Sequence, residues 1–303
     1  MKFVKCVFVI LLLVPLLGCT AGAMAPTATV APTDTVAPSA THNPTLQPED
    51  LKYTITAGGE ERFYLLHIPP GLDELQPLPV VFAFHGWGDT PSDLQGYIGL
   101  DEIANEKGFI TVYPDGVEHS WNAGGCCGAA QARAVNDIDF TRQIIADLSA
   151  RLNIDKQRIY ALGISNGAGF VYRLACEMSD TFAAIAPVAG AQIFDPCRPQ
   201  RPVSIVHMHG LKDDAAPYAG GGEYKILPIE QLIYNWGVLD GCVDAPLVDA
   251  SMKFVRHIIY SNCTDDTAVE LYAIEIGYHS WPSDAVMPAS TIIWDFFAAH
   301  PKK

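Results

Sequence analysis

The motif Gly163-Ile164-Ser165-Asn166-Gly167 has the pattern G-x-S-x-G and joins two segments of different periodicity. Residues 158–162 form a short, mainly apolar run typical of a buried strand, and apolar residues recur at helical spacing from Phe170 to Ala175. A strand, a sharp turn and a helix in this order are the setting of a nucleophile elbow, in which glycines relieve the crowding of the turn. We therefore predict that Ser165 is a nucleophile whose oxygen is lifted into a cleft.

Expected strands and helices alternate through residues 49–303, which predicts one α/β domain. Two strands, 53–56 and 62–68, open it. The later strands are mostly continuous apolar runs, suited to a sheet covered on both faces, at 79–84, 109–113, 158–164, 182–188, 203–208 and 269–276. Amphipathic helices are expected at 92–107, 137–152, 166–178, 228–239 and 291–299. This pattern predicts an open, mostly parallel sheet with helices on both faces, and a ligand site beyond the carboxyl ends of the strands, where Ser165 lies.

A serine hydroxyl needs a base that takes its proton and a carboxylate that holds this base in one tautomer. In the α/β-hydrolase fold these groups follow in the order serine, acid, histidine. The expected strand 203–208 leads into Asp213 and Asp214, and the strand 269–276 leads into His279. We predict a triad of Ser165, Asp213 and His279. Spacing alone does not separate Asp213 from Asp214, because a shift of one residue reverses which carboxylate points inward.

Other histidines fit the base position less well. His300 lies beyond the last helix, and His257 lies within a strand-like segment. His207 and His209 alternate on one strand ahead of two carboxylates, a spacing that also suits a metal ion. A metal site would leave the serine motif unexplained, so we predict neither a metal nor a cofactor.

Hydrolysis of an ester also needs hydrogen-bond donors for the developing oxyanion. One donor in this fold is the backbone N–H after the nucleophile, which here belongs to Asn166. The other is expected in the loop after an early strand, and Phe84-His85-Gly86-Trp87-Gly88 occupies that place. We predict the N–H of Trp87 as the second donor.

The first 48 residues differ from the rest in composition. Lys2 and Lys5 precede an apolar run at 7–17, which predicts an export signal over residues 1–19. Its end, Leu16-Leu17-Gly18-Cys19, resembles a bacterial lipobox, whose cysteine becomes the lipidated first residue. Residues 20–48 are rich in Pro, Thr and Ala, which indicates an extended tether. We predict an extracellular or periplasmic protein attached to a membrane only through lipid on Cys19.

Charge and cysteine content indicate which partners and which covalent links to expect. The formal net charge of −15 is spread along the chain without a basic patch, which does not favour nucleic acid as a partner. Six cysteines beyond the signal predict three disulfides in an exported domain: Cys126, Cys127, Cys176, Cys197, Cys242 and Cys263. We expect Cys242 to pair with Cys263, and the other four to pair among themselves but not as the adjacent couple.

A larger set of motifs resembles the polyhydroxybutyrate depolymerase/feruloyl esterase family, of the carbohydrate esterase family 1 type. The resemblance covers nearly all of residues 50–300, and its most specific part is the run from Trp121 to Gly128. The motifs are His85-Gly86, Tyr113-Pro-Asp-Gly116, Trp121-Asn-Ala-Gly-Gly-Cys-Cys-Gly128, the G-x-S-x-G motif, Arg173-Leu-Ala-Cys-Glu177, Ala186-Pro-Val-Ala-Gly190, His209-Gly210 through Pro217-Tyr218, and His279-Ser-Trp-Pro282. The resemblance implies an α/β-hydrolase fold and assigns the acid role to Asp213. The chain departs from the family pattern at Leu211 and Ala216, which affects the expected substrate preference rather than hydrolysis.

Members of this family cleave feruloyl or acetyl esters on plant polysaccharides, or esters of hydroxyalkanoate polymers. Because the chain has no separate polymer-binding domain, we favour feruloyl or acetyl esters of xylan fragments over polyhydroxybutyrate. A non-catalytic binding lipoprotein on the same scaffold is the alternative from another class. We predict substrate contacts from the side chains of His85, Trp121, Tyr218 and Trp281, with the two tryptophans as an aromatic wall.

Overall fold

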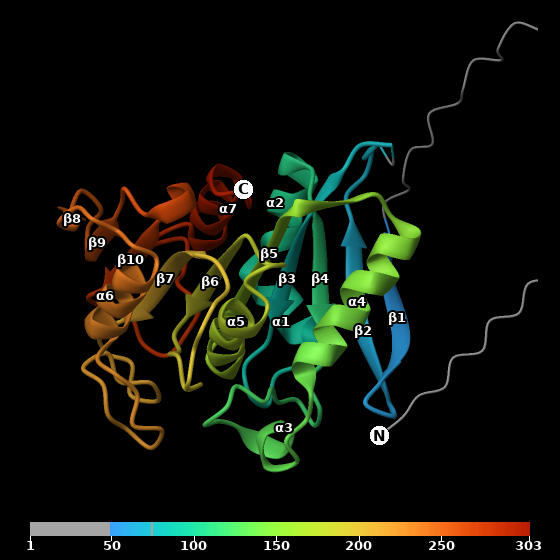
Figure 1. The fold of residues 1–303 in the computed structure, drawn as a ribbon, viewed down its shortest axis with the longest axis horizontal. Helices are drawn as coiled ribbons and strands as arrows, with labels where there is room; N and C mark the ends of the chain where they lie inside the picture. The colour runs from blue at the N-terminus through green and yellow to red at the C-terminus, as the bar shows by residue number, and fades with distance from the viewer. Residues whose placement is uncertain (1–48, 74) are drawn as a thin grey trace, which may run out of the picture. The chain divides into compact units, whose positions relative to one another are not determined.

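The apolar runs form one ten-stranded sheet in the computed structural model, which describes residues 49–73 and 75–303 (Figure 1). The export signal, Cys19 and the tether therefore lie outside the described residues. The strand order is β1-β2-β4-β3-β5-β6-β7-β10-β9-β8. The strands are β1 Glu49–Ala57, β2 Glu60–Ile68, β3 Leu78–Phe84, β4 Ile110–Pro114, β5 Ile154–Ile164, β6 Ala184–Val188, β7 Ser204–Gly210, β8 Leu247–Asp249, β9 Val255–Tyr260 and β10 Val269–Ile274.

The central strands β4, β3, β5, β6, β7 and β10 run parallel, whereas β1 and β2 at one edge and β8 and β9 at the other pair antiparallel. This confirms the mostly parallel sheet. The strand β8 was not predicted, because its three residues are all exposed and carry no apolar periodicity.

Helices cover both faces of the sheet, as predicted. They are α1 Pro91–Ile98, α2 Leu100–Lys107, α3 Gly128–Ala132, α4 Asp137–Arg151, α5 Asn166–Glu177, α6 Ile229–Leu239 and α7 Ala289–Ala299, and Thr264–Asp266 form a 3₁₀ turn. The single helix expected at 92–107 is two helices, because Gly99 adopts a left-handed conformation with φ of 61°. None of the helices in the described part of the chain has the length and apolar character to span a bilayer.

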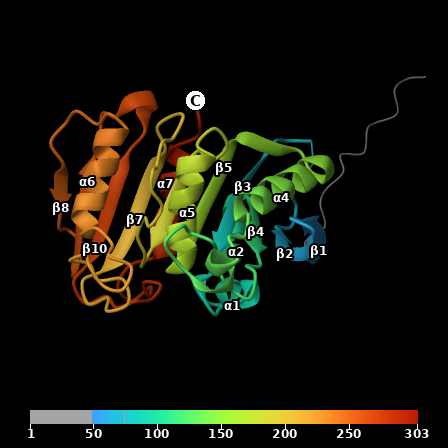
Figure 2. The ribbon, with the colours of Figure 1, turned by 60° about the horizontal axis from the view of Figure 1, so that its bottom comes forward.

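The core has two layers, one on each face of the sheet. Phe82 and Phe84 of β3 point into a cluster with residues of α4, α5 and α6, which lie in front of the strands in Figure 2. The alternate residues Val81 and Ala83 point into a second cluster with residues of α1, α2 and α7. Strand alternation thus divides the buried residues between two helical layers.

Three disulfides link the six cysteines of the described chain. Cys242 bonds to Cys263 as predicted. Cys176 at the end of α5 bonds to Cys197, with Cα atoms 5.0 Å apart. Cys126 bonds to Cys127, so the prediction that the adjacent couple does not pair was wrong. Cys176 and Cys197 meet at the end of α5, whereas Cys126 and Cys127 lie beside Ser165 in the loop after β4. Among the cysteines of residues 49–303, Cys126 and Cys127 are therefore left to pair with one another.

Candidate active site

Ser165 lies at the junction of β5 and α5, in the sharp turn that the motif predicts. Its backbone has φ of 56° and ψ of −117°, a strained conformation for a residue with a side chain. Two glycines make the turn sterically feasible. A Cβ atom on Gly163 would collide with the carbonyl of Gly167, and one on Gly167 would collide with the carbonyl of Phe84. The Ser165 side chain is half-buried at the carboxyl end of the sheet.

The imidazole of His279 joins Ser165 to Asp213. Its Nε2 lies 2.9 Å from Ser165 Oγ, and its Nδ1 lies 2.8 Å and 3.0 Å from the two carboxylate oxygens of Asp213. The loops after β7 and β10 carry the acid and the histidine, and these strands are parallel neighbours. The N–H of Lys212 donates to the carbonyl of Gly277 at 2.9 Å, which ties the two loops together. The structure thus brings together the three residues predicted from widely separated segments.

The Asp213 carboxylate is fully buried and well supplied with donors. The N–H groups of Ala215 and Ala216 donate to its Oδ1 at 3.0 Å and 2.7 Å. Burial alone would raise the pKa of Asp213, but hydrogen bonds from His209, His279 and Ala216 hold the pKa below its ordinary value. Asp214 is exposed at the rim of the cavity beside Ser165, so Asp213 is the carboxylate that faces His279.

The two residues predicted as oxyanion donors, Asn166 and Trp87, both line the cavity beside Ser165. Asn166 is the first residue of α5, and the N–H groups of a first helical turn have no partner within the helix. Gly86 lies against Ser165, since a Cβ on Gly86 would stand 3.6 Å from Ser165 Cβ. The adjoining Trp87 lines the same cavity. The assignment of these two N–H groups as oxyanion donors stays a prediction.

A cavity of about 430 Å³ opens beside Ser165 and His279. Such a volume suits a ligand of moderate size. Apolar and aromatic groups from several loops contribute to its lining: Trp87, Cys126, Cys127, Ile193, Tyr224 and Ile226. None of these side chains was predicted to line the cavity, because Trp87 was predicted only for its backbone N–H and the two cysteines only for disulfides. Ile193, Tyr224 and Ile226 belong to loops without a recognisable motif, and only the folded chain brings them to Ser165.

The predicted substrate contacts of His85 and Trp121 were wrong, because both side chains are completely buried. Trp121 packs edge-on against Phe84, and its Nε1–H donates to the carbonyl of His85 at 3.0 Å. His85 Nε2 accepts the N–H of Gly116 at 3.0 Å. These side chains support the loops around the site and do not form its wall.

Tyr218 and Trp281 do not line the cavity beside Ser165, contrary to the prediction. The hydroxyl of Tyr218 donates to Glu230 at 2.9 Å. Trp281 lines a separate hollow of about 190 Å³ and packs against the second core cluster. It follows His279 by two residues, but the loop carries its side chain toward this other hollow.

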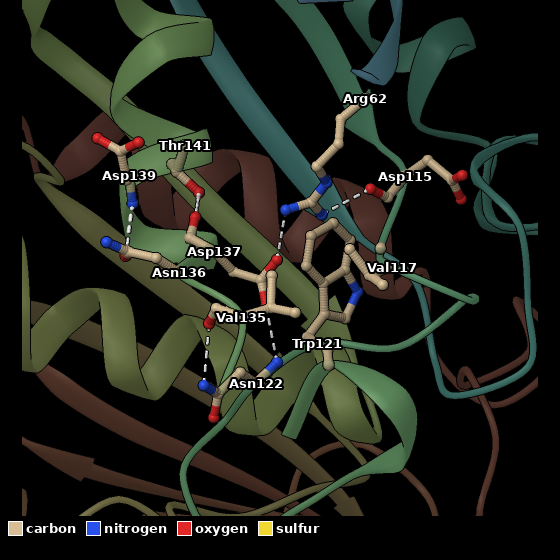
Figure 3. A network of polar contacts seen from close by, with 12 residues as sticks. Arg62, Asp115, Val117, Trp121, Asn122, Val135, Asn136, Asp137, Asp139 and Thr141 are labelled. Carbon is tan, nitrogen blue, oxygen red and sulfur yellow. Dashed lines mark hydrogen bonds and ion pairs between the residues drawn. The ribbon is translucent and has the colours of Figure 1, made fainter. Parts of the chain in front are cut away.

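A buried ion pair supports the loop that contains Trp121 (Figure 3). Arg62 of β2 donates to Asp137 Oδ1 at 2.7 Å and to the carbonyl of Asp115 at 2.8 Å. The other oxygen of Asp137 accepts the N–H of Asn122 at 2.8 Å. The Arg62 guanidinium lies over the Phe140 ring, 3.7 Å from its centre. The network was not predicted, because Arg62 and Asp137 are 75 residues apart and carry no joint motif.

This loop is joined to the nucleophile turn through the side chain of Asn166. Its Oδ1 accepts the N–H of Trp121 at 2.7 Å, and its Nδ2 donates to the carbonyl of Trp121 at 3.0 Å. The residue after Ser165 is therefore held by two hydrogen bonds to one peptide segment.

Comparison with known proteins shows which proteins the chain is similar to. The family model for esterase PHB depolymerase matches residues 62–197, which include the nucleophile turn and the loop from Trp121 to Gly128. Feruloyl esterase B of Piromyces equi is 27% identical over 251 residues, covering 78% of this chain and 44% of that protein. The match and the relatives support the polyhydroxybutyrate depolymerase/feruloyl esterase family for this chain.

Other members differ in length and in sequence. The bifunctional acetylxylan esterase/xylanase XynS20E of Neocallimastix patriciarum is 31% identical over 140 residues, 46% of this chain and 20% of that protein. The chain thus spans less than half the length of either curated relative. The acetyl xylan esterase from Aspergillus awamori superposes with a TM-score of 0.57 at 14% identity, covering 82% of this chain and 99% of that chain. This likeness confirms the α/β-hydrolase fold expected for the family.

Proposed function

We propose that this chain is an exported serine esterase that cleaves feruloyl or acetyl esters on xylan fragments. The observation that carries the proposal is the continuous hydrogen-bonded series from Ser165 through His279 to Asp213, beside a cavity. The relatives named for feruloyl and acetylxylan ester hydrolysis support the substrate class.

In the proposed reaction His279 Nε2 takes the proton of Ser165 Oγ as this oxygen attacks the ester carbonyl. The N–H groups of Asn166 and Trp87 donate to the resulting oxyanion. His279 then passes the proton to the leaving alcohol oxygen, and the C–O bond of the ester breaks to leave an acyl group on Ser165. Water attacks this acyl group with His279 as base, which releases the carboxylic acid and restores the serine. Asp213 holds the Nδ1–H of His279 throughout.

The cavity lining favours an acyl group with apolar area. Ile193, Ile226 and Tyr224 supply apolar walls, and the exposed ring of Trp87 offers a stacking surface at the rim. A phenylpropenoyl group fits such surroundings through its ring, and an acetyl group occupies a small part of them.

Export and lipid attachment through Cys19 are part of the same proposal. Three disulfides in the described chain support an oxidising compartment. Replacement of Cys19 by serine in the native host should release the protein from the membrane or block its processing, and an unmodified amino terminus on the native protein would contradict the anchor.

The decisive test compares Ser165→Ala with Ser149→Ala, using p-nitrophenyl acetate, methyl ferulate and an acetylated xylo-oligosaccharide. Ser149 is exposed on α4, where its hydroxyl donates to the carbonyl of Ile145, and it does not line the cavity beside Ser165. We expect Ser165→Ala to lower kcat by about 10³-fold or more, and Ser149→Ala to leave kcat unchanged. If Ser165→Ala retained a tenth of the wild-type activity, the assignment of Ser165 as the nucleophile would be refuted. Rapid clearing of a polyhydroxybutyrate suspension without release of ferulate or acetate would instead identify a polyester depolymerase.

A further inference from the structure

A buried series of polar side chains runs from helix α5 to the carboxylate of Asp213. The hydroxyl of Tyr172 lies 2.7 Å from His207 Nδ1, and His207 Nε2 lies 3.0 Å from His209 Nδ1. His209 Nε2 lies 2.8 Å from the carbonyl oxygen of Ala216 and 3.3 Å from Asp213 Oδ2. Tyr172, His207 and His209, which we call the relay, are all inaccessible to solvent or nearly so. The mechanism described above does not use them.

The chemistry of the last acceptor fixes the direction of the hydrogen bonds. A carbonyl oxygen only accepts, so His209 Nε2 carries a proton and donates it to Ala216. In the neutral ring His209 Nδ1 is then an acceptor, and the facing Nε2 of His207 must donate. His207 Nδ1 accepts in turn from the hydroxyl of Tyr172. Each donor of the relay therefore points toward Asp213.

Burial supports the neutral forms that this direction requires. Burial, reinforced by the neighbouring His209, holds the pKa of His207 well below its ordinary value, although Asp213 opposes the shift. Burial likewise raises the pKa of the Tyr172 hydroxyl, which keeps its proton. The other groups around the relay are Tyr218, whose ring lies edge-on to His209, and Trp236, which stacks on Tyr172. Apart from Asp213, none of these neighbours carries a formal charge.

The relay ends at the oxygen that also binds the catalytic histidine. Asp213 Oδ2 lies 2.8 Å from His279 Nδ1 and faces His209 Nε2, whereas Oδ1 takes the backbone N–H groups of Ala215 and Ala216. His209 Nε2 therefore contacts both the carboxylate of Asp213 and, at the carbonyl of Ala216, the turn that carries Asp213. A rotation of the carboxylate plane would break the contacts with His209 and His279 together.

We propose that Tyr172, His207 and His209 are positioning residues that hold Asp213, and through it His279, in the geometry needed for proton transfer. This inference rests on the proposed esterase activity. The hydroxyl of Tyr172 selects the tautomer of His207, this tautomer selects that of His209, and His209 holds the carboxylate and the 213–216 turn. Helix α5 thus carries the nucleophile at its first turn and fixes the acid from its second.

The test removes one hydroxyl at the far end of the relay. In Tyr172→Phe the ring still packs on Trp236, but His207 loses the donor that selects its tautomer. Asp213 then receives a weaker bond from His209, so its charge is more available to the imidazolium form of His279. We expect kcat to fall about tenfold, as for the loss of one hydrogen bond, with KM unchanged. The acid limb of the kcat/KM profile should move to higher pH, which a change in packing alone would not produce.

Tyr160→Phe is the matched control. Tyr160 is also a buried tyrosine, but it lies in the second core cluster, and within the described part of the chain its hydroxyl has no hydrogen-bond partner. We expect its kcat and its acid limb to match those of the wild type. If wild type and Tyr172→Phe had the same kcat and the same pH dependence of kcat/KM, the proposed role of the relay would be overturned. The esterase proposal would stay intact.

A second measurement does not depend on activity or on a variant. ¹⁵N NMR of the histidine-labelled wild-type protein at neutral pH reports which ring nitrogen is protonated. We expect His207 and His209 to carry their protons on Nε2. A proton on Nδ1 of either ring, or a cationic ring, would overturn the relay. Because this measurement needs no substrate, a protein without esterase activity that shows both expected tautomers would contradict the proposed function and not the relay geometry.

Discussion

Gly167 lies directly against the carbonyl oxygen of Phe84, so the first turn of α5 touches the end of β3 with no side chain between them. This contact brings the nucleophile turn beside the loop that contains Gly86 and Trp87. The close approach is needed if both predicted oxyanion donors are to reach one substrate oxygen.

Replacement of Gly167 by alanine should therefore separate β3 from α5. We expect the free energy of unfolding to fall by about 1–3 kcal/mol, with a large loss of esterase activity. Gly96→Ala is the control, because Gly96 lies in helix α1 with no atom within 4 Å of an added Cβ. That change should stabilise the protein by roughly 0.5–1 kcal/mol. Urea unfolding measures the free energy of unfolding of both variants. Equal values for Gly167→Ala and Gly96→Ala would contradict the close contact of Gly167 with Phe84.

Asp213→Asn should be far more damaging than Asp214→Asn. The carboxylate of Asp213 is buried against His279, and an amide there favours the wrong tautomer of the imidazole, with a loss in kcat on the order of 10⁴. Asp214 is exposed at the cavity rim, so its neutralisation should change kcat by less than about threefold. Steady-state kinetics on p-nitrophenyl acetate decides between them. A larger loss for Asp214→Asn would reverse the assignment of the acid.

Asp240 should make the stability of the domain depend on pH. Burial raises its pKa from an ordinary 3.8 to about 7, with the N–H of Val203 and the charge of Arg201 opposing the rise, and its Oδ2 has no hydrogen-bond partner among the described residues. Between about pH 4 and pH 7 the folded state thus binds a proton that the unfolded state has released, so stability falls as pH rises through this window.

Asp240→Asn should remove this pH dependence and raise the free energy of unfolding at pH 8 by about 2–4 kcal/mol. Asp244→Asn, at an exposed position, should leave the pH dependence as it is. Chemical denaturation at pH 5 and pH 8 measures both. A wild-type stability that rises between these values through Asp240 would have the wrong sign for a buried neutral acid.

The disulfide between Cys242 and Cys263 should stabilise the end of the domain that carries α6 and β9. Its partners are 21 residues apart, and the chain-entropy model gives a loop of this length about 3 kcal/mol. The double replacement of both cysteines by serine should lower the free energy of unfolding by this amount. Thiol titration of the denatured, unreduced wild-type domain should find none of the six cysteines reactive, and several reactive thiols would refute the pairing.

Trp87 rather than Trp281 should affect the binding of esters that have an aromatic acyl group. The Trp87 ring is 58% exposed and lines the cavity beside Ser165, whereas Trp281 lines the separate hollow. Trp87→Ala keeps the backbone N–H, so we expect KM for methyl ferulate to rise about two- to tenfold with little change in KM for p-nitrophenyl acetate. Trp281→Ala should leave both values nearly unchanged. The reverse ranking would restore Trp281 as an acyl-site residue.

The sequence by itself determined the elements whose information is local. The turn at Ser165 needs only a strand, two glycines and a helix within residues 158–175, and these are visible as a change of apolar period around Ser165. The continuous apolar runs predicted the central parallel strands, because a strand covered on both faces must be apolar on both. The order of Ser165, Asp213 and His279 followed from the ends of such strands.

Only the tertiary structure decided which distant side chains meet. His85 and Trp121 lie near the nucleophile in the motif pattern but point into the core, and Ile193 and Ile226 reach the cavity from loops without a pattern. The pairing of Cys126 with Cys127 followed from where Cys176 and Cys197 meet. The relay joins residues of α5 and β7 that are 35 residues apart. Such contacts depend on how the helices pack over the sheet and on the paths of the loops, and no local periodicity in the chain records either.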